Sequence, residues 1–318
     1  MAFSLWSTTT TLLLALAFIA RPTSATPPTV NEVFHIKPGT TAGGCDNHAS
    51  LLRDWFKDAQ ALTDAALRRV QRTDADSAQY LATFFGLKLE HAAPVADRLR
   101  AVRHFLHTPT SDDPADGANR PWLFCSDAWL REQAWTEVAY DSDTGQPRQD
   151  GKRIRDLVPD AQQDEIEFPY WSSDLSSYLV LSPEMHCTNG QVLGASGREG
   201  WDVWSYVALC TENIAADRHR VKALTLSQVR PVTDIWVQVA ERYPASLVLL
   251  HEIFHIVNSP MPDWAYEFAE VIALRPDHAI ENPETYVLYA LALWLAEKNE
   301  AFSFSPGWSV ILRHRAPK

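Results

Sequence analysis

The chain has 318 residues, of which 46% are hydrophobic and 21% charged, and it contains 12 tryptophans. This composition is typical of a globular protein with a buried core, and it excludes a disordered or fibrous chain. The formal net charge of −12 argues against nucleic acid as a partner, because an acidic surface repels phosphate groups.

The first 25 residues have the pattern of a secretory signal peptide. Residues 12–20 form an apolar run that is too short to span a bilayer, and Pro22 and the small residues after it suit cleavage after Ala25. No Lys or Arg precedes the run, which departs from the usual signal-peptide pattern. A signal anchor is the alternative, although the short run argues against it. No other stretch is apolar over a membrane-spanning length. We therefore expect a secreted, extracellular protein whose single domain, residues 26–318, has no membrane contact after signal cleavage.

Helical periodicity dominates the first part of this domain. Residues 26–44 are rich in Thr, Pro and Gly and predict an extended lead-in. The next segment predicts an amphipathic helix, because its apolar residues recur every three or four positions. These residues are Leu52, Trp55, Phe56, Ala59, Leu62, Ala66, Leu67 and Val70. Two further helices are expected around residues 77–86 and 94–107.

Residues 108–176 differ in character from the segments on either side. Acidic, turn-rich stretches at residues 111–117 and 141–145 alternate with short ordered pieces such as residues 121–125. We interpret this region as a large irregular acidic insertion within the domain rather than a domain of its own.

The rest of the chain combines short strands with long helices. Aromatic and aliphatic residues predict strands at 178–181 and 204–209. From Pro244 to about Asn299 the pattern is helical. The expected fold class is α+β, mostly helical, with a small sheet.

Four cysteines follow the predicted signal peptide, at Cys45, Cys125, Cys187 and Cys210. An even count in an exported chain indicates two disulfides, with three pairings possible. Zinc binding by these cysteines is the alternative, although no C-x-x-C pair is present.

The segment His251-Glu252-Ile253-Phe254-His255 carries the clearest chemical signal. It lies in the apolar run 247–257, which predicts a buried helix, and burying imidazole without partners is costly. Histidines four residues apart lie on one helix face and can both bind one zinc ion. Glu252 then lies beside the open position of the metal, where a general base acts.

A catalytic zinc also needs a third protein ligand and one position open to water. A metzincin would have Gly at 258 and His at 261, and Asn258 and Met261 exclude that class. A gluzincin would use a Glu on a later helix, which leaves Glu270, Glu281 and Glu284 as candidates. The nearest candidate is Asp263, eight residues after His255 and just beyond a Pro-rich turn.

In these features the chain resembles the aspzincin metalloendopeptidases, which comprise the deuterolysins and the lysine-specific metallo-endopeptidases. The family follows H-E-x-x-H with G-T-x-D-Y-x-Y, and the segment Met261-Pro262-Asp263-Trp264-Ala265-Tyr266 matches its Asp and its second Tyr. Asn282-Pro283-Glu284-Thr285-Tyr286 is similar to the N-A-D-x-x segment of the family. Weaker similarities at Gly44-Cys45, 80–86 and 206–210 extend the resemblance over about residues 43–297.

The chain also departs from the family pattern. The G-T before the Asp is missing, Trp264 replaces a Tyr, and residues 126–176 have no counterpart. The missing G-T bears on the geometry of the turn that would carry Asp263.

The resemblance implies a zincin-like fold with the sheet beside the active-site helix, and a secreted zinc-dependent endopeptidase. Zinc would be held by His251, His255 and Asp263, Glu252 would act as general base, and Tyr266 would donate to the oxyanion. A packed aromatic is the alternative reading of Tyr266.

The resemblance further implies a substrate-binding role for Glu284. It aligns with the acidic residue that gives some relatives a preference for lysine after the scissile bond. Asn282, Pro283 and Glu284 also read as the cap and first turn of a helix. For the cysteines, the resemblance implies the pairs Cys45–Cys125 and Cys187–Cys210.

A second hypothesis is a catalytically weak or inactive secreted binding or effector protein on a zincin scaffold, suggested by the missing G-T and the acidic insertion. A third possibility is that residues 26 to about 120 form a removable propeptide. For the enzyme we expect protein or peptide substrates and a monomer.

Overall fold

The computed structural model describes most of the chain. The described ranges are 26–110, 120–158, 167–182, 187–199, 204–229, 239–298, 302–305 and 311–314. The predicted signal peptide, residues 1–25, lies outside these ranges, as do residues 111–117 of the predicted insertion.

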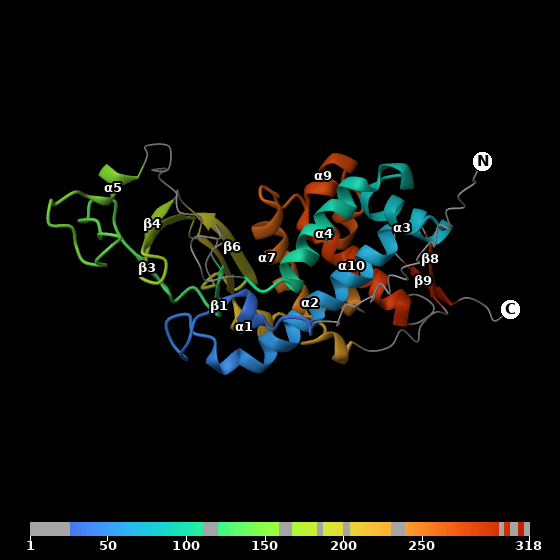
Figure 1. The fold of residues 1–318 in the computed structure, drawn as a ribbon, viewed down its shortest axis with the longest axis horizontal. Coiled ribbons are helices and arrows are strands. Elements are labelled where there is room, and N and C mark those ends of the chain that lie inside the picture. The colour runs from blue at the N-terminus through green and yellow to red at the C-terminus, as the bar shows by residue number, and fades with distance from the viewer. Residues whose placement is uncertain are drawn as a thin grey trace, which may run out of the picture.

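Within the described ranges, five long helices form the main body of the protein. They are α2 (Ala49–Val70), α3 (Ala75–Phe85), α4 (Ala93–His107), α7 (Ser246–Asn258) and α10 (Pro283–Lys298). α2 packs against α4, α7 and α10, so these four helices share one core (Figure 1). The eight apolar residues that predicted α2 are all buried, and they form the face that makes these contacts.

Short helices connect the larger elements. They are α1 (Val30–Val33), α5 (Ile154–Leu157), α6 (Thr211–Ala216), α8 (Phe268–Val271) and α9 (Pro276–Glu281). The ends of α3 follow ordinary capping chemistry. The Asp74 carboxylate accepts the Ser77 N–H at 2.8 Å, and Gly86 ends the helix in the left-handed conformation with φ of 63°.

A four-stranded sheet lies against α7 and positions the site described below. Its strand order is β1 (His35–Ile36), β2 (Trp122–Phe124), β7 (Trp204–Leu209) and β6 (Gly194–Glu199). β1, β2 and β7 run parallel, and β6 pairs antiparallel with β7 at the edge. The strand predicted at 204–209 is confirmed as β7, whereas β6 was not predicted.

A second, antiparallel sheet lies beside the first, on the side away from the long helices (Figure 1). It consists of β3 (Leu130–Glu132), β4 (Phe168–Ser172) and β5 (Ser177–Leu181), and β5 confirms the strand predicted at 178–181. Aromatic stacking links the two sheets, since the Phe124 ring at the end of β2 lies 3.9 Å from the Trp129 ring before β3. A hairpin of β8 (Phe302–Ser305) and β9 (Ile311–His314) completes the described strands.

Two disulfides join segments that are distant in sequence. Cys45 bonds to Cys125, and Cys187 bonds to Cys210, which confirms the pairs implied by the resemblance. The first ties the segment before α2 to the end of β2, and the second ties the loop before β6 to the end of β7.

Helices and small sheets thus pack together in one structure, which confirms the expected α+β class. Within the described ranges, no helix combines the length and the apolar character that crossing a membrane requires.

Candidate metal centre

α7 is the buried helix that the apolar run predicted. Ten of its thirteen residues are buried, and it packs against α2, α4, α10 and both β6 and β7. His251 and His255 lie one turn apart, so their rings emerge on the same face, with centroids 4.9 Å apart. This face looks into a cleft of about 580 Å³ rather than into the core.

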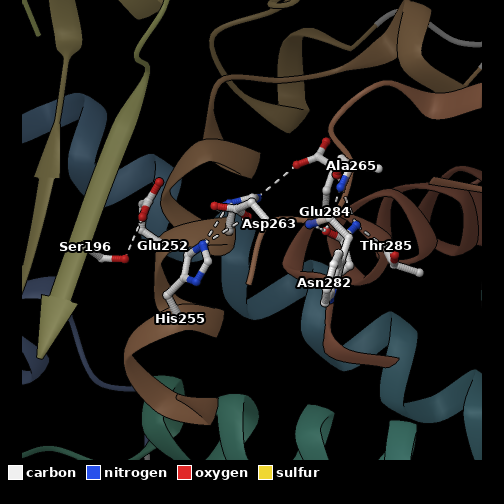
Figure 2. A network of polar contacts seen from close by, with 10 residues as sticks. Ser196, Glu252, His255, Asp263, Ala265, Asn282, Glu284 and Thr285 are labelled. Carbon is white, nitrogen blue, oxygen red and sulfur yellow. Dashed lines mark hydrogen bonds and ion pairs between the residues drawn. The ribbon is translucent and has the colours of Figure 1, made fainter. Parts of the chain in front are cut away.

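Asp263 completes a group of three potential metal ligands. Its Oδ1 atom lies 3.1 Å from His251 Nε2 and 3.2 Å from His255 Nε2, and the two Nε2 atoms are 3.1 Å apart. Figure 2 shows Asp263, on the chain that follows α7, with its carboxylate directed at His255. In the described part of the chain, no other group of three His, Cys, Asp or Glu residues has ligand atoms this close together.

The three donor atoms form an almost equilateral triangle that suits one small cation. A tetrahedral ion with bonds of roughly 2.0 Å separates its ligand atoms by roughly 3.3 Å, close to the distances observed. Hydrogen bonds alone cannot serve all three edges, because each Nε2 carries at most one hydrogen. The donor set of two imidazoles and one carboxylate leaves a fourth position open, as in catalytic zinc sites.

Glu284, near the start of α10, lies behind His251. Its Oε2 atom is 3.0 Å from His251 Nδ1, and the residue is only 1% exposed. A carboxylate on Nδ1 fixes the ring and leaves Nε2 free to bind a metal. Burial alone would lower the pKa of His251, but hydrogen bonds with Asp263 and Glu284 raise it to about 10.

Asn282 holds the segment that carries Asp263. Its Oδ1 accepts the backbone N–H groups of Trp264 and Ala265, at 3.0 and 3.3 Å. Its Nδ2 donates to the Ala265 carbonyl and to the Thr285 hydroxyl, at 3.1 and 3.0 Å. The side chain therefore holds a turn that is distant in sequence (Figure 2). Asn282 also directly precedes α10, whose first residue is Pro283 and whose first turn contains Glu284, as the capping interpretation expected.

Glu252 faces the same cleft from the neighbouring position of α7. Its Oε2 accepts a hydrogen bond of 2.6 Å from the Ser196 hydroxyl on β6. β6 can approach this closely because residue 194 is glycine: a Cβ there would lie 2.7 Å from Glu252 Oε1. The carboxylate is thus held beside the triangle of donors without being one of them.

Tyr266 lies on the open side of the site. Its ring stacks on that of His251, with centroids 5.8 Å apart, and the residue is 46% exposed. Burial of the phenol, and then the Asp263 carboxylate, raise the pKa of Tyr266 well above its usual value. The hydroxyl therefore keeps its proton at neutral pH and can donate a hydrogen bond.

The structure thus brings all six predicted site residues to one cleft. Glu270 and Glu281, the other candidates for third ligand, are exposed and do not belong to the metal-ligating group. Sequence reasoning missed Ser196, Gly194 and the role of Asn282. Gly194 and Ser196 belong to no recognisable motif, so the sequence does not indicate that they lie against Glu252.

A scan against models of protein families and a search of curated proteins gave no match to this chain. The function is therefore inferred from the geometry of the site and from the H-E-x-x-H motif.

Proposed function

We propose that this protein is a zinc-dependent endopeptidase with a zincin-like fold and an aspzincin-like ligand set. The observation that carries the proposal is the juxtaposition of two features in one cleft. His251, His255 and Asp263 form a triangle of the size a tetrahedral ion requires, and the carboxylate of Glu252 lies next to it. Zinc is favoured because two imidazoles and one carboxylate are ligands that this ion binds readily.

When bound here, zinc would lower the pKa of a water molecule to about 7 and polarise a peptide carbonyl. Glu252 would take the proton of the attacking water and pass it to the leaving amine. Ser196 orients this carboxylate through its short hydrogen bond. Tyr266 keeps its proton and would donate to the oxyanion as negative charge develops there.

The edge strand β6 supports a peptide as the substrate. Among the described residues β6 pairs only with β7, so its other edge can accept the backbone of an extended chain. Residues 191–196 line the cleft together with the triangle of donors. A peptide added to β6 would therefore run past the site with its carbonyl groups held in order.

Glu284 supports His251 in this proposal rather than contacting the substrate. Its side chain is 2% exposed and already bonded to Nδ1, so it is not free to receive a lysine ammonium group. The preference for lysine that the resemblance implies therefore stays a prediction, and the position of Glu284 does not support it.

The test is the Glu252→Gln variant, which keeps the shape of the side chain and removes the base. We expect about one zinc per chain in both proteins and a fall in peptide hydrolysis of roughly 100- to 10,000-fold in the variant. Chelation should abolish the activity of the wild type, and zinc should restore it. Full activity of the variant would rule out this mechanism. Zinc binding without cleavage across a broad peptide library would instead favour the inactive binding protein.

Secretion and a monomeric state are part of the same proposal. The two disulfides are consistent with an oxidising compartment. N-terminal sequencing of the secreted protein would show whether cleavage follows Ala25 or whether a longer propeptide is removed.

A further inference from the structure

Arg220 is a basic residue in a cleft whose acidic lining residues are Glu252, Asp263 and Glu284. It lines the cleft that holds the triangle of donors and also an adjoining recess of about 230 Å³. Its guanidinium lies over the Tyr266 ring, 5.6 Å from the centroid. Because Tyr266 stacks on His251, this places a fixed positive charge one aromatic ring away from the metal ligands.

The turn that carries Arg220 is held from both ends. The Asp217 carboxylate accepts the backbone N–H groups of His219 and Arg220, at 3.0 and 2.9 Å. Beyond the turn, the Lys222 N–H donates to the Tyr243 carbonyl at 2.8 Å. The backbone position of Arg220 is therefore set by the fold, and its half-buried side chain contacts the Tyr266 ring.

In the described part of the chain, no carboxylate lies within 4.0 Å of the Arg220 guanidinium. Every ion pair found there joins other residues. Glu284 lines the same space, but its carboxylate is sealed and bonded to His251. Glu241 and Glu267 lie at the recess but are exposed, so solvent and salt screen their charges.

Lys222 is the other cation of Arg or Lys type at the recess. Its Nζ donates to the backbone carbonyls of Arg218 and His219, which leaves it less free to bind a ligand. Arg220 has five N–H donors in a planar fork that matches a carboxylate, and the structure pairs that fork with no acid of the described chain.

We infer that Arg220 binds a carboxylate of the substrate close to the scissile bond. This inference deepens the proposed peptidase function and rests on it. The carboxylate can come from an acidic side chain next to the scissile bond or from the C-terminus of a short peptide. An acidic side chain at that position would imply a preference opposite to the lysine preference of the aspzincin relatives.

The experiment measures peptide binding to the zinc-loaded Glu252→Gln protein, so that it does not depend on cleavage. One set of fluorescent peptides, otherwise uncharged, would carry Glu, Gln or Lys at one central position. A second set, with a neutral central residue, would end in either a free carboxylate or an amide. A charged hydrogen-bonded pair predicts binding of the carboxylate peptide about tenfold tighter than that of its amide analogue. A central-Glu preference identifies the side chain as the source, and a free-acid preference identifies the C-terminus.

Adding Arg220→Gln should reduce this tenfold ratio to about one, and Arg220→Lys should keep part of it. The matched control is Arg218→Gln, which removes the same charge from an exposed residue that lines neither the cleft nor the recess. It should leave the ratio unchanged. Binding of the Lys peptide as tight as that of the Glu peptide, with no preference for the free acid, would overturn the inference. So would a ratio that survives in Arg220→Gln. Peptide hydrolysis by the wild type is assayed separately. A failure of the proposed peptidase function can therefore be distinguished from a failure of the inference about Arg220.

Discussion

Two residues at and just before the start of α10 support two of the three candidate metal ligands. Glu284 contacts His251, and Asn282 contacts the backbone just after Asp263. Ligand positions at a metal site depend on such partners, because an ion gains affinity only where its donors are already in place. The two side chains can be tested separately.

Glu284→Gln removes the charge behind His251 and keeps nearly the same shape. We expect zinc affinity to fall about 10- to 100-fold, because His251 loses the carboxylate that orients it and increases its basicity. Competition with a chromophoric chelator measures this. Glu281→Gln, an exposed change three residues earlier, should leave the affinity unaltered. Equal affinities in all three proteins would remove Glu284 from the metal centre.

Asn282→Ala removes four hydrogen bonds from a fully buried position. The free energy of unfolding of the metal-free protein should fall by about 3 kcal/mol, measured by urea denaturation, and zinc affinity should fall as well. Asn213→Ala is the matched control, since Asn213 donates to three backbone carbonyls away from the ligands. It should lower stability only. If both variants lost affinity equally, the effect would be one of general stability.

Residue-level prediction succeeded where the chemistry is local in sequence. The spacing of His251 and His255 determines which way their rings point, and Asp263 follows closely enough for a turn to return it. The contact of Glu284 with His251 could not be predicted, because it depends on how α10 packs against α7. The same holds for Arg220, which reaches the cleft from a turn before α7.

At the scale of elements, β6 shows why a strand beside the site escaped prediction. Its first four residues are Gly194, Ala195, Ser196 and Gly197, which have low strand propensity. The small residues are needed because β6 lies against α7 and the Tyr206 ring. The small residues that let β6 approach the site also have low strand propensity, and for this reason the strand could not be predicted from the sequence.

Gly194→Ala tests how β6 positions Glu252. The new methyl group would lie 2.7 Å from Glu252 Oε1 and 3.1 Å from a Val248 methyl group, so the carboxylate must shift. We expect kcat for peptide hydrolysis to fall about a hundredfold with zinc content unchanged. Gly190→Ala, where an added Cβ meets nothing within 4 Å, is the control and should retain its kcat. An unchanged kcat in Gly194→Ala would show that the position of Glu252 tolerates the shift.

For the whole molecule, the long helices and the α+β class followed from periodicity, because a buried helix face leaves a regular pattern. The disulfide pairs did not follow from the residues alone, since four cysteines allow three pairings. Their arrangement is a property of the complete fold: each bridge joins the end of a strand in the first sheet to a segment far from it in sequence.

Proton binding at His251 connects the metal site to the stability of the whole molecule. Its pKa in the metal-free fold is about 10, against an ordinary value of 6.5. A raised folded-state pKa adds stability that is complete below pH 6.5 and is lost as pH rises through about 10. Zinc must displace this proton, so its affinity rises with pH over the same interval.

The melting temperature of the chelated protein should therefore fall from about pH 7 to pH 9, while the increase produced by zinc grows. Melting scans with chelator and with excess zinc measure both trends. The His251→Asn variant supplies the background from all other titrating groups, and subtracting its scans isolates the contribution of this imidazole. A stabilisation by zinc that stays constant with pH would mean that metal binding releases no proton from His251. The imidazole of His251 would then already be neutral before the metal arrives.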